Sequence, residues 1–397
     1  MKQLVLSDKN RKLRLILLCV FLLIAIIAFT VGLFAALDTE PGWGAVECSA
    51  SEVNCSSDFI FSYCYGQTAE NPASEQKRLS NFYSQAATDA WRIFHTDVAA
   101  INSQVNTTLT VDPALYEAFS LIRQYGSRCL YLGPVYEAYG NLFVAQSDGE
   151  AAQYDPAQDA EQAAYLTELT AFTSDPSMVD LQLLPDHQVR LVVAPEYLEY
   201  AQANEITQFL DFGWTANAFI ADYLADVLTE AGFTNGFLAS YDGFTRNLDD
   251  RGEEFSLNLF SRRETSIYLA GTMQYNQPIS IVFLRDYPMS QRDQYSYYTF
   301  QSGHIVSAMV DPSDGLCKSA TDSLVSYSYD LGCAEVLLQQ IPLFVADSLD
   351  TEALAAMHGD GISSIWFDGT VLSCNDADMQ IKLNPESGVD YTLEYVK

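Results

Sequence analysis

Apolar residues recur along this chain with two periods, one of about 3.6 residues and one of two residues. Between residues 79 and 101 they are spaced three and four apart, which predicts one long amphipathic helix. The stretch 113–126, PALYEAFSLIRQYG, begins with a proline and predicts a second helix. FIFSYCYG at 59–66 is mostly aromatic and apolar and predicts a strand.

The same criteria divide the rest of the chain into short helices and strands, and no segment repeats another. An acidic, alanine-rich stretch at 145–163 leads into a helix that is expected to reach about residue 172. This mixture predicts an α+β domain. The remaining expectations are strands at 177–184, 188–194, 263–273 and 278–287, helices from about 331 and at 350–357, and a hairpin at Asp368-Gly369.

The stretch DFGWTANAFIAD at 211–222 predicts a turn that opens into a helix. The apolar segment 205–210 before it predicts a strand, Thr215 is a candidate helix cap, and Gly232 is a stop signal. Free backbone N–H groups at such a helix start favour a negative charge, for which a phosphate is suitable. A strand-to-helix turn without a ligand also explains this stretch when it is taken alone.

An uncharged apolar run at 15–37 is long enough to cross a bilayer as a single span. Five basic residues and one acidic residue precede it, so the flank is expected to stay in the cytoplasm and the rest to lie outside the cell membrane. A signal peptide cleaved near Ala35 and Ala36 is the alternative, and it would release the same outside domain. The expected division is 1–14 cytoplasmic flank, 15–37 membrane anchor, 38–57 linker and 58–397 folded domain.

The chain of 397 residues carries 20 basic and 52 acidic residues, for a formal net charge of −32. Such a charge repels phosphate backbones, so nucleic acid is not an expected partner. Seven cysteines follow the apolar run, and they show neither a CxxC motif nor the spacing of a zinc site. Cys48, Cys55 and Cys64 are close enough in sequence for one disulfide, but their spacing does not determine the pairing.

The stretch at 211–222 is followed along the chain by ASYDG at 239–243, VDPSDG at 310–315 and YDLGCAEVLL at 329–338. Taken in this order, these motifs resemble the FAD:protein FMN transferase family, the ApbE type. The family has roughly DLGGIAKGYAVD at 211–222, where Asp211, Gly213, Ala216 and Asp222 of this chain match. The resemblance extends over nearly all of 58–380. The further correspondences are 111–140 with a stretch containing a glycine-proline-like turn, ASYDG at 239–243 with AGGD, VDPSDG at 310–315 with IDPRTG, and YDLGCAEVLL at 329–338 with an aspartate followed four residues later by threonine.

The resemblance implies transfer of FMN from FAD to a threonine or serine of an extracytoplasmic redox protein, with a divalent cation such as Mg²⁺. Attack on a pyrophosphate requires charge neutralisation, an activated hydroxyl and alignment. By resemblance, the backbone carbonyl of Ala216 and the carboxylate of Asp330 hold the cation. The family's histidine is missing from its place just before the Asp-Pro pair, and His304, seven residues before Asp311, is the candidate base that would substitute for it. The residues expected to contact the flavin or its phosphates are Asp211, Gly213, Trp214, Thr215, Asn217, Tyr241 and Asp242.

The chain also departs from the family pattern at positions that matter for this chemistry. Two functions therefore stay open, a membrane-anchored flavin transferase or a catalytically degenerate member that binds a flavin or nucleotide or acts as a scaffold. A hydrolase has little support, because the chain contains no GxSxG, HExxH or P-loop motif. The departures are Trp214 and Ala218 for glycines, Asn217 for lysine, Ser240 and Tyr241 for a glycine pair, Ala334 for threonine, and Ser307 and Ala308 in place of a histidine.

Overall fold

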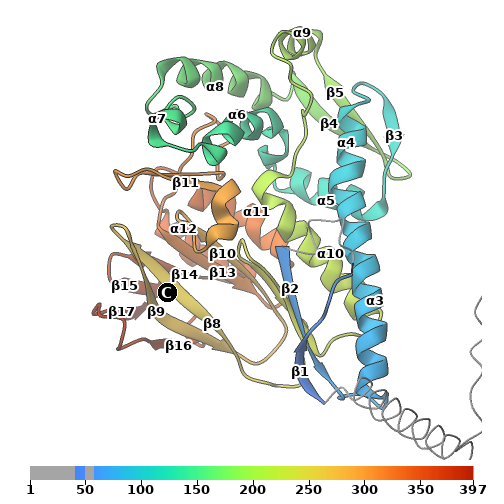
Figure 1. Cartoon of the computed structure of the whole chain (residues 1–397), viewed down its shortest axis with the longest axis vertical. Coiled ribbons are helices and arrows are strands. Elements are labelled where there is room, and N and C mark those ends of the chain that lie inside the picture. The colour runs from blue at the N-terminus through green and yellow to red at the C-terminus, as the bar shows by residue number, and fades with distance from the viewer. Residues whose placement is uncertain (1–40, 50–57, 397) are drawn as a thin grey trace, which may run out of the picture.

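The computed structural model describes residues 41–49 and 58–396 (Figure 1). The expected cytoplasmic flank and membrane anchor, 1–14 and 15–37, lie outside the described residues. In the part that is described, no helix is both long enough and apolar enough to cross a membrane.

A nine-stranded sheet forms the centre of the domain (Figure 1). Its neighbouring strands are antiparallel, except for the parallel pair formed by the last two. In spatial order the strands are β1 Gly42–Ala45, β2 Phe59–Tyr65, β6 Gly236–Ser240, β7 Phe244–Asn247, β10 Ile279–Arg285, β13 Ser323–Ser328, β14 Ser363–Asp368, β15 Val371–Cys374 and β17 Thr392–Tyr395.

Both faces of this sheet are covered, which explains why every residue of β10 is buried. Because side chains alternate along a strand, Ile281 and Phe283 belong to one hydrophobic cluster, and Val282 and Leu284 belong to the other. The smaller cluster contains residues from a three-stranded sheet on one face, and the larger cluster contains the helices on the other. The three strands are β16 Gln380–Leu383, β9 Ser266–Tyr275 and β8 Phe255–Arg263.

Two helices next to the central strands position the candidate site. Helix α10 packs against β7 and β6, while α11 packs against β10 and β13, and the two helices contact each other. Long helix α3 lies on the other side of α10 (Figure 1). The α-helices are α3 Pro72–Trp91, α4 Asp97–Asn102, α5 Pro113–Gln124, α6 Gly133–Val144, α7 Asp148–Ala151, α8 Ala160–Thr173, α9 Pro195–Ala203, α10 Ala216–Glu230, α11 Cys333–Phe344 and α12 Thr351–Met357.

Two small sheets complete the domain. One has the order β3-β5-β4, and the other pairs β11 with β12. Their bounds are β3 Thr108–Thr110, β4 Val179–Leu184, β5 Gln188–Val193, β11 Tyr297–Thr299 and β12 Ile305–Ser307.

Most of the elements expected from periodicity are confirmed. The long helix at 79–101 is formed by α3 and α4, with one π-helical turn, Arg92–Thr96, between them. Helix α5 begins at the expected proline, and the Asp112 side chain caps it by accepting the Ala114 N–H at 3.0 Å. The final hairpin joins β14 to β15 through Gly369, which has a φ of 61°.

The strand expected at 205–210 is not formed, so this prediction was wrong. The Asn102 side chain accepts the N–H groups of Phe209 and Leu210 at 3.0 and 2.9 Å, and it donates to the Leu210 carbonyl at 2.8 Å. Glu205 has a φ of 58°, which interrupts an extended backbone. An amide from another helix thus satisfies backbone groups that a strand would pair with a neighbour.

Part of the range expected to be a linker belongs to the sheet. Strand β1 pairs antiparallel with β2, and Gly42 lies opposite Tyr65. The Trp43 ring packs edge-on against Phe255, with centroids 5.6 Å apart. The first strand therefore lies within the range 38–57, before the start expected for the domain.

The described cysteines do not form disulfides. Cys48 and Cys64, two of the three candidates for pairing, are free, and Cys55 lies outside the described residues. The other described cysteines, Cys129, Cys317, Cys333 and Cys374, are also free thiols.

Candidate functional site

A cavity of about 590 Å³ lies beside the turn that joins β6 to β7. Four of the residues expected to contact a flavin line it, namely Trp214, Asn217, Tyr241 and Asp242. Trp214 lies in the 3₁₀ turn Gly213–Thr215 just before α10, and Asn217 lies in the first turn of that helix. Tyr241 and Asp242 belong to the β6–β7 turn, so distant parts of the chain meet here. The opposite wall includes Arg285, Asp293, Tyr295, Tyr297 and Met309.

Asp242 connects the turn to α10. Its Oδ2 accepts a hydrogen bond from Asn217 Nδ2 at 2.9 Å. Burial raises the pKa of the Asp242 carboxyl to about 6, although the Asn217 hydrogen bond and the positive charge of Arg285 both oppose this rise. The carboxyl therefore changes its protonation state in mildly acidic solution.

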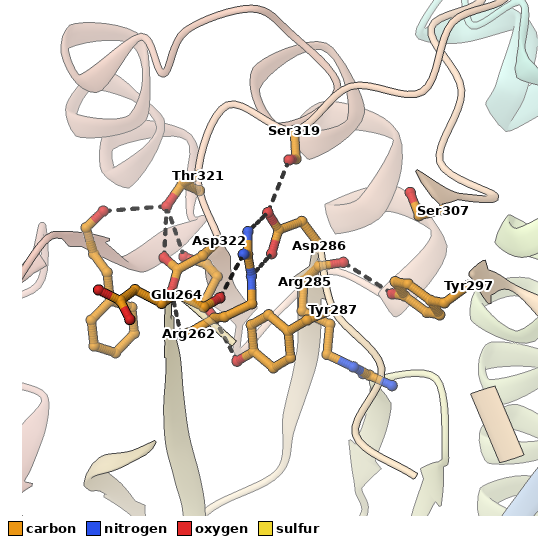
Figure 2. A network of polar contacts seen from close by, with 12 residues as sticks. Arg262, Glu264, Arg285, Asp286, Tyr287, Tyr297, Ser307, Ser319, Thr321 and Asp322 are labelled. Carbon is orange, nitrogen blue, oxygen red and sulfur yellow. Dashed lines mark hydrogen bonds and ion pairs between the residues drawn. The ribbon is translucent and has the colours of Figure 1, made fainter. Parts of the chain in front are cut away.

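Arg285 connects the same turn to the loop on the opposite wall. It ends β10 with 3% of its surface exposed, and its Nη2 lies 2.7 Å from Asp293 Oδ1. Its guanidinium also donates to the carbonyls of Tyr241 and Asp242 at 3.3 and 3.4 Å. The Tyr297 hydroxyl donates to the Arg285 carbonyl at 3.0 Å (Figure 2). These contacts hold the two walls of the cavity together.

Three buried polar atoms of the cavity-lining residues have no hydrogen-bond partner in the part of the chain that the structure describes. They are Trp214 Nε1, Asp242 Oδ1 and Arg285 Nε. Trp214 Nε1 and Arg285 Nε are hydrogen-bond donors, and the carboxylate oxygen Asp242 Oδ1 is an acceptor. An unsatisfied buried polar group costs about 1–3 kcal/mol, so this set favours a ligand that supplies two acceptors and one donor.

Aromatic side chains surround these polar atoms. The Arg292 guanidinium lies 3.9 Å from the centre of the Tyr241 ring, an arrangement that stabilises a cation against an aromatic face. Tyr241 and Tyr295 are 38% and 68% exposed at the cavity. The cavity thus offers flat surfaces to an aromatic ligand as well as hydrogen bonds.

The other residues expected to contact a flavin have structural roles. Asp211 Oδ1 accepts the Gly213 N–H at 2.8 Å, and Asp211 lines a separate cavity with His95. Gly213 has a φ of 52°, and a Cβ there would lie 2.2 Å from the Tyr136 ring. The space beside this glycine is therefore filled by the Tyr136 side chain. Thr215 occupies the N-cap position of α10, as expected, but its side chain does not cap the helix, because its hydroxyl donates to the Phe212 carbonyl at 2.6 Å.

The two residues expected to hold a cation lie on neighbouring segments. Ala216 is the first residue of α10, and a carbonyl at that place accepts the N–H four residues later in the helix. Asp330 is exposed and lies between β13 and α11. Its side chain does not cap α11, whose N-cap is Gly332.

The residues present do not fit a magnesium site. Within residues 41–49 and 58–396, no group of three or more His, Cys, Asp and Glu side chains is placed to hold a metal ion. Mg²⁺ requires octahedral oxygen coordination, and Ala334 contributes no side-chain oxygen. The nearby carboxylate of Asp222 is already engaged by Arg246 and by the N–H groups of Cys333 and Ala334.

His304 lies in another pocket, of about 260 Å³, whose lining includes Arg262 and Asp286. Its Nε2 is 3.3 Å from Asp155 Oδ2, and its ring stacks on Phe300 with centroids 5.5 Å apart. Figure 2 shows Asp286 directed toward Arg262, whereas the side chain of its neighbour Arg285 points to another side. The candidate base is thus separate from the cavity that contains Asp242.

Sequence reasoning missed Arg285 and Asp293, which shape this cavity. The one available signal was an arginine at the end of the apolar run PISIVFLRDY at 278–287. A charge in such a strand requires a partner once it is buried, and Asp293 supplies it from the following loop.

Replacing Asp242 with asparagine is expected to raise the free energy of unfolding at neutral pH by about 1–3 kcal/mol. The pKa of about 6 in the folded protein exceeds the ordinary aspartate value of 3.8. The stability that this carboxyl contributes is therefore fully present below pH 3.8 and is lost as the pH rises through about 6. Asparagine imitates the protonated form. Urea unfolding at a series of pH values should show the two proteins converging near pH ~4.

Glu386→Gln, which neutralises an exposed carboxylate, is the control for this prediction. Asp322 has a pKa that burial also raises to about 6, so the Asp242 variant should retain part of the pH dependence. An Asp242→Asn protein whose unfolding follows that of the wild type at every pH would contradict the assignment.

No family model and no curated protein matches the chain. The ApbE protein from Thermotoga maritima has a similar structure, with a TM-score of 0.57, 11% identity, and coverage of 86% of this chain and 97% of that one. The flavinyl transferase ApbE from Pseudomonas stutzeri, in its apo form, is also similar, with a TM-score of 0.51 and 13% identity. That comparison covers 87% of this chain and 94% of the other. The α+β domain of this protein therefore has the ApbE-like fold that its motifs predicted.

Proposed function

We propose that this protein binds a flavin nucleotide such as FAD in the cavity between the start of α10 and the β6–β7 turn. The observation that carries the proposal is the set of three unpaired atoms, Trp214 Nε1, Asp242 Oδ1 and Arg285 Nε. The pyrimidine edge of an oxidised flavin presents an acceptor, a donor and an acceptor, which are the two C=O groups and the N–H between them. The two donors and one acceptor of the protein therefore match the two acceptors and one donor of the flavin in number and kind.

The shape of the cavity also supports an aromatic ligand. Its volume of about 590 Å³ is within the range of small-molecule sites, about 300–1,000 Å³. Tyr241, Tyr295 and Trp214 provide flat apolar surfaces against which a ring system can pack. A ligand here would satisfy buried polar atoms and cover exposed aromatic rings at the same time.

Transfer of FMN from FAD to a threonine or serine of a target protein is the second candidate function. The ApbE-like fold favours transfer. The contact between α10 and α11 also favours it, because Ala216 is the first residue of α10 and Asp330 precedes α11 by a few residues. The unsuitable magnesium ligands argue against it, and we therefore place binding first. In that account the chain is a catalytically degenerate relative of the transferases.

We also propose that the domain acts outside the cytoplasm, anchored in the cell membrane by residues 15–37. The support is the length of that apolar run and the basic flank before it. A redox protein at the outer surface of the membrane is the proposed partner, because bound flavin serves electron transfer. A protease added to intact cells should then digest the domain, and full protection of the domain would contradict this topology.

A titration of the full-length protein in detergent with FAD tests the proposed binding. Quenching of flavin fluorescence should report saturable binding, and Trp214→Leu should weaken it about tenfold, which corresponds to the loss of ~1.4 kcal/mol for one hydrogen bond. Trp43→Leu is the matched control, because Trp43 lies on β1 and does not line the cavity. Absence of saturable binding, or equal weakening by both substitutions, would refute the proposal.

A covalent labelling assay separates binding from transfer. The protein, FAD, Mg²⁺ and a target that carries an acceptor threonine are mixed and resolved on a denaturing gel. The binding account predicts no flavin-labelled target. A labelled band that disappears in Asp330→Asn would establish the second candidate instead.

A further inference from the structure

We propose that the end of the domain that carries Trp43 rests on the outer headgroup layer of the membrane, and that the ligand cavity faces away from it. The partner of the bound flavin then meets the cavity above the membrane surface. This inference rests on the membrane anchor proposed above at residues 15–37, and it adds where the domain lies relative to the bilayer.

The tether between the expected span and the folded domain is short. A linker was expected over residues 38–57, but β1 begins at Gly42. Pro41 follows the last residue of the expected span by four residues, so the two are at most about 14 Å apart. The headgroup layer is about 5–8 Å thick on each side of a bilayer. Pro41 is therefore held no more than about 10 Å outside that layer.

The chain enters the domain beside the loop that leads from β2 into α3. A Cβ built at Gly66 would lie 2.9 Å from the Pro41 ring and 3.3 Å from the Pro72 ring, so these three residues meet. Helix α3 begins at Pro72, and Figure 1 shows its start and β1 at the lower end of the domain. The tether therefore fixes this end of the domain near the membrane.

Trp43 is an exposed aromatic residue at this end. Its ring packs against Phe237 and Phe255, with centroids 6.1 and 5.6 Å away, yet 47% of the residue remains exposed. Tryptophan suits the headgroup region, because its ring is apolar and its N–H can donate to polar headgroup atoms or water. The tether and Trp43 thus give the domain two points of contact with the membrane at the same end.

The charges beside Trp43 do not favour attraction to anionic lipids. The Arg251 guanidinium lies 5.8 Å from the centre of the Trp43 ring, but it forms an ion pair with Asp249. Asp250 and Glu253 in the same loop are acidic and exposed. Anionic headgroups repel such a loop, so the contact depends on the aromatic ring and on headgroups without net charge.

The cavity lies at the other end of β2. Trp43 pairs with Cys64 on that strand, whereas Asp58, which lines the cavity, precedes Cys64 by six residues. At about 3.3 Å per residue, the cavity is roughly 20 Å along the strand from Trp43. The proposed partner therefore presents its redox group in an extracytoplasmic domain, beyond the headgroups, and not within the bilayer.

Tryptophan fluorescence of the full-length protein in phosphatidylcholine nanodiscs tests this proposal. Part of the lipid carries a nitroxide on its headgroup, which quenches tryptophans close to it. The wild type should lose part of its emission, and Trp43→Phe should lose almost none. Phenylalanine keeps a ring against Phe255, so the variant should fold. Wild-type emission that the nitroxide lipid leaves unchanged, or an equal fractional loss in Trp43→Phe, would overturn the proposal.

Trp91→Phe is the matched control. Trp91 is half-buried at the far end of α3, about 28 Å along the helix axis from Pro72. This variant should be quenched as the wild type is, and a variant that is no longer quenched would place the contact at Trp91 and contradict the proposal. Replacing part of the lipid with phosphatidylglycerol should leave the quenching unchanged. Quenching that requires this anionic lipid would overturn the aromatic contact.

Size-exclusion chromatography of the same samples separates a failure of this inference from a failure of the anchor. The proposed anchor predicts that the protein co-elutes with the nanodiscs. A protein that elutes apart from them would refute the anchor, and this proposal with it. Co-elution without quenching of Trp43 would overturn only the placement of the domain and would leave the anchor and the flavin site standing.

Discussion

Replacing Arg285 with methionine is expected to lower the free energy of unfolding by about 3–5 kcal/mol and to abolish flavin binding. The substitution leaves the carboxylate of Asp293, which is 6% exposed, without its cation. It also removes the hydrogen bonds to the carbonyls of Tyr241 and Asp242 that hold the β6–β7 turn. Urea unfolding and a flavin titration measure the two effects separately.

Arg78→Met is a matched control for this prediction. Its partner is Glu70, and the side chains are 51% and 33% exposed, so the pair should contribute less than about 1 kcal/mol. If Arg285→Met unfolds with the same loss as the control, the buried pair does not support the cavity as described. If it is destabilised but binds flavin normally, the cavity is not the flavin site.

Asp222→Ala should also destabilise the domain strongly, by about 3 kcal/mol or more. It leaves the Arg246 guanidinium without its counter-charge and removes the acceptor of two N–H groups at the start of α11. Asp222→Asn retains one acceptor oxygen and should lose less stability. Calorimetry or urea unfolding should rank the wild type as the most stable, then Asp222→Asn, then Asp222→Ala.

A loss below about 1 kcal/mol for Asp222→Ala would contradict the role assigned to this carboxylate, since that is the range of exposed pairs. The same measurement with Arg246→Met shows whether the pair acts as a unit. Asp222→Ala, Arg246→Met and the double variant form a double-mutant cycle. The double variant should lose less free energy of unfolding than the two single variants lose when their losses are added.

Periodicity predicted the fold where local sequence and tertiary packing agree. The helices α5 and α8 and the strands β4 and β5 have local patterns that their packing preserves. The segment 205–210 has a strand-like pattern, but Asn102, more than a hundred residues away in sequence, binds its backbone groups. No local pattern contains that information.

The candidate site could be predicted only in part. The motifs pointed to Trp214, Asn217, Tyr241 and Asp242, which do meet at one cavity. Arg285 comes to the same place through strand register, because β10 pairs with β7 with Val282 opposite Phe244, and the strand then continues past the β6–β7 turn. Register across a sheet depends on pairing between distant segments, which the spacing of residues does not reveal.

The expected cation site shows a different limit. Ala216 and Asp330 keep the positions of the family pattern, so the resemblance implied a metal. The pairing of Asp222 with Arg246 and with the start of α11 joins residues 24 and 111 positions apart. Contacts of this kind decide whether a carboxylate is available to a cation, and they became visible only in three dimensions.

The most direct test of flavin binding is a crystal structure of the protein grown with FAD. The account predicts an isoalloxazine ring beside Trp214, with its pyrimidine edge within hydrogen-bond distance of Asp242 Oδ1 and Arg285 Nε and with no metal ion at Asp222. A flavin bound at another cavity, or crystals that contain no flavin at saturating FAD, would contradict it.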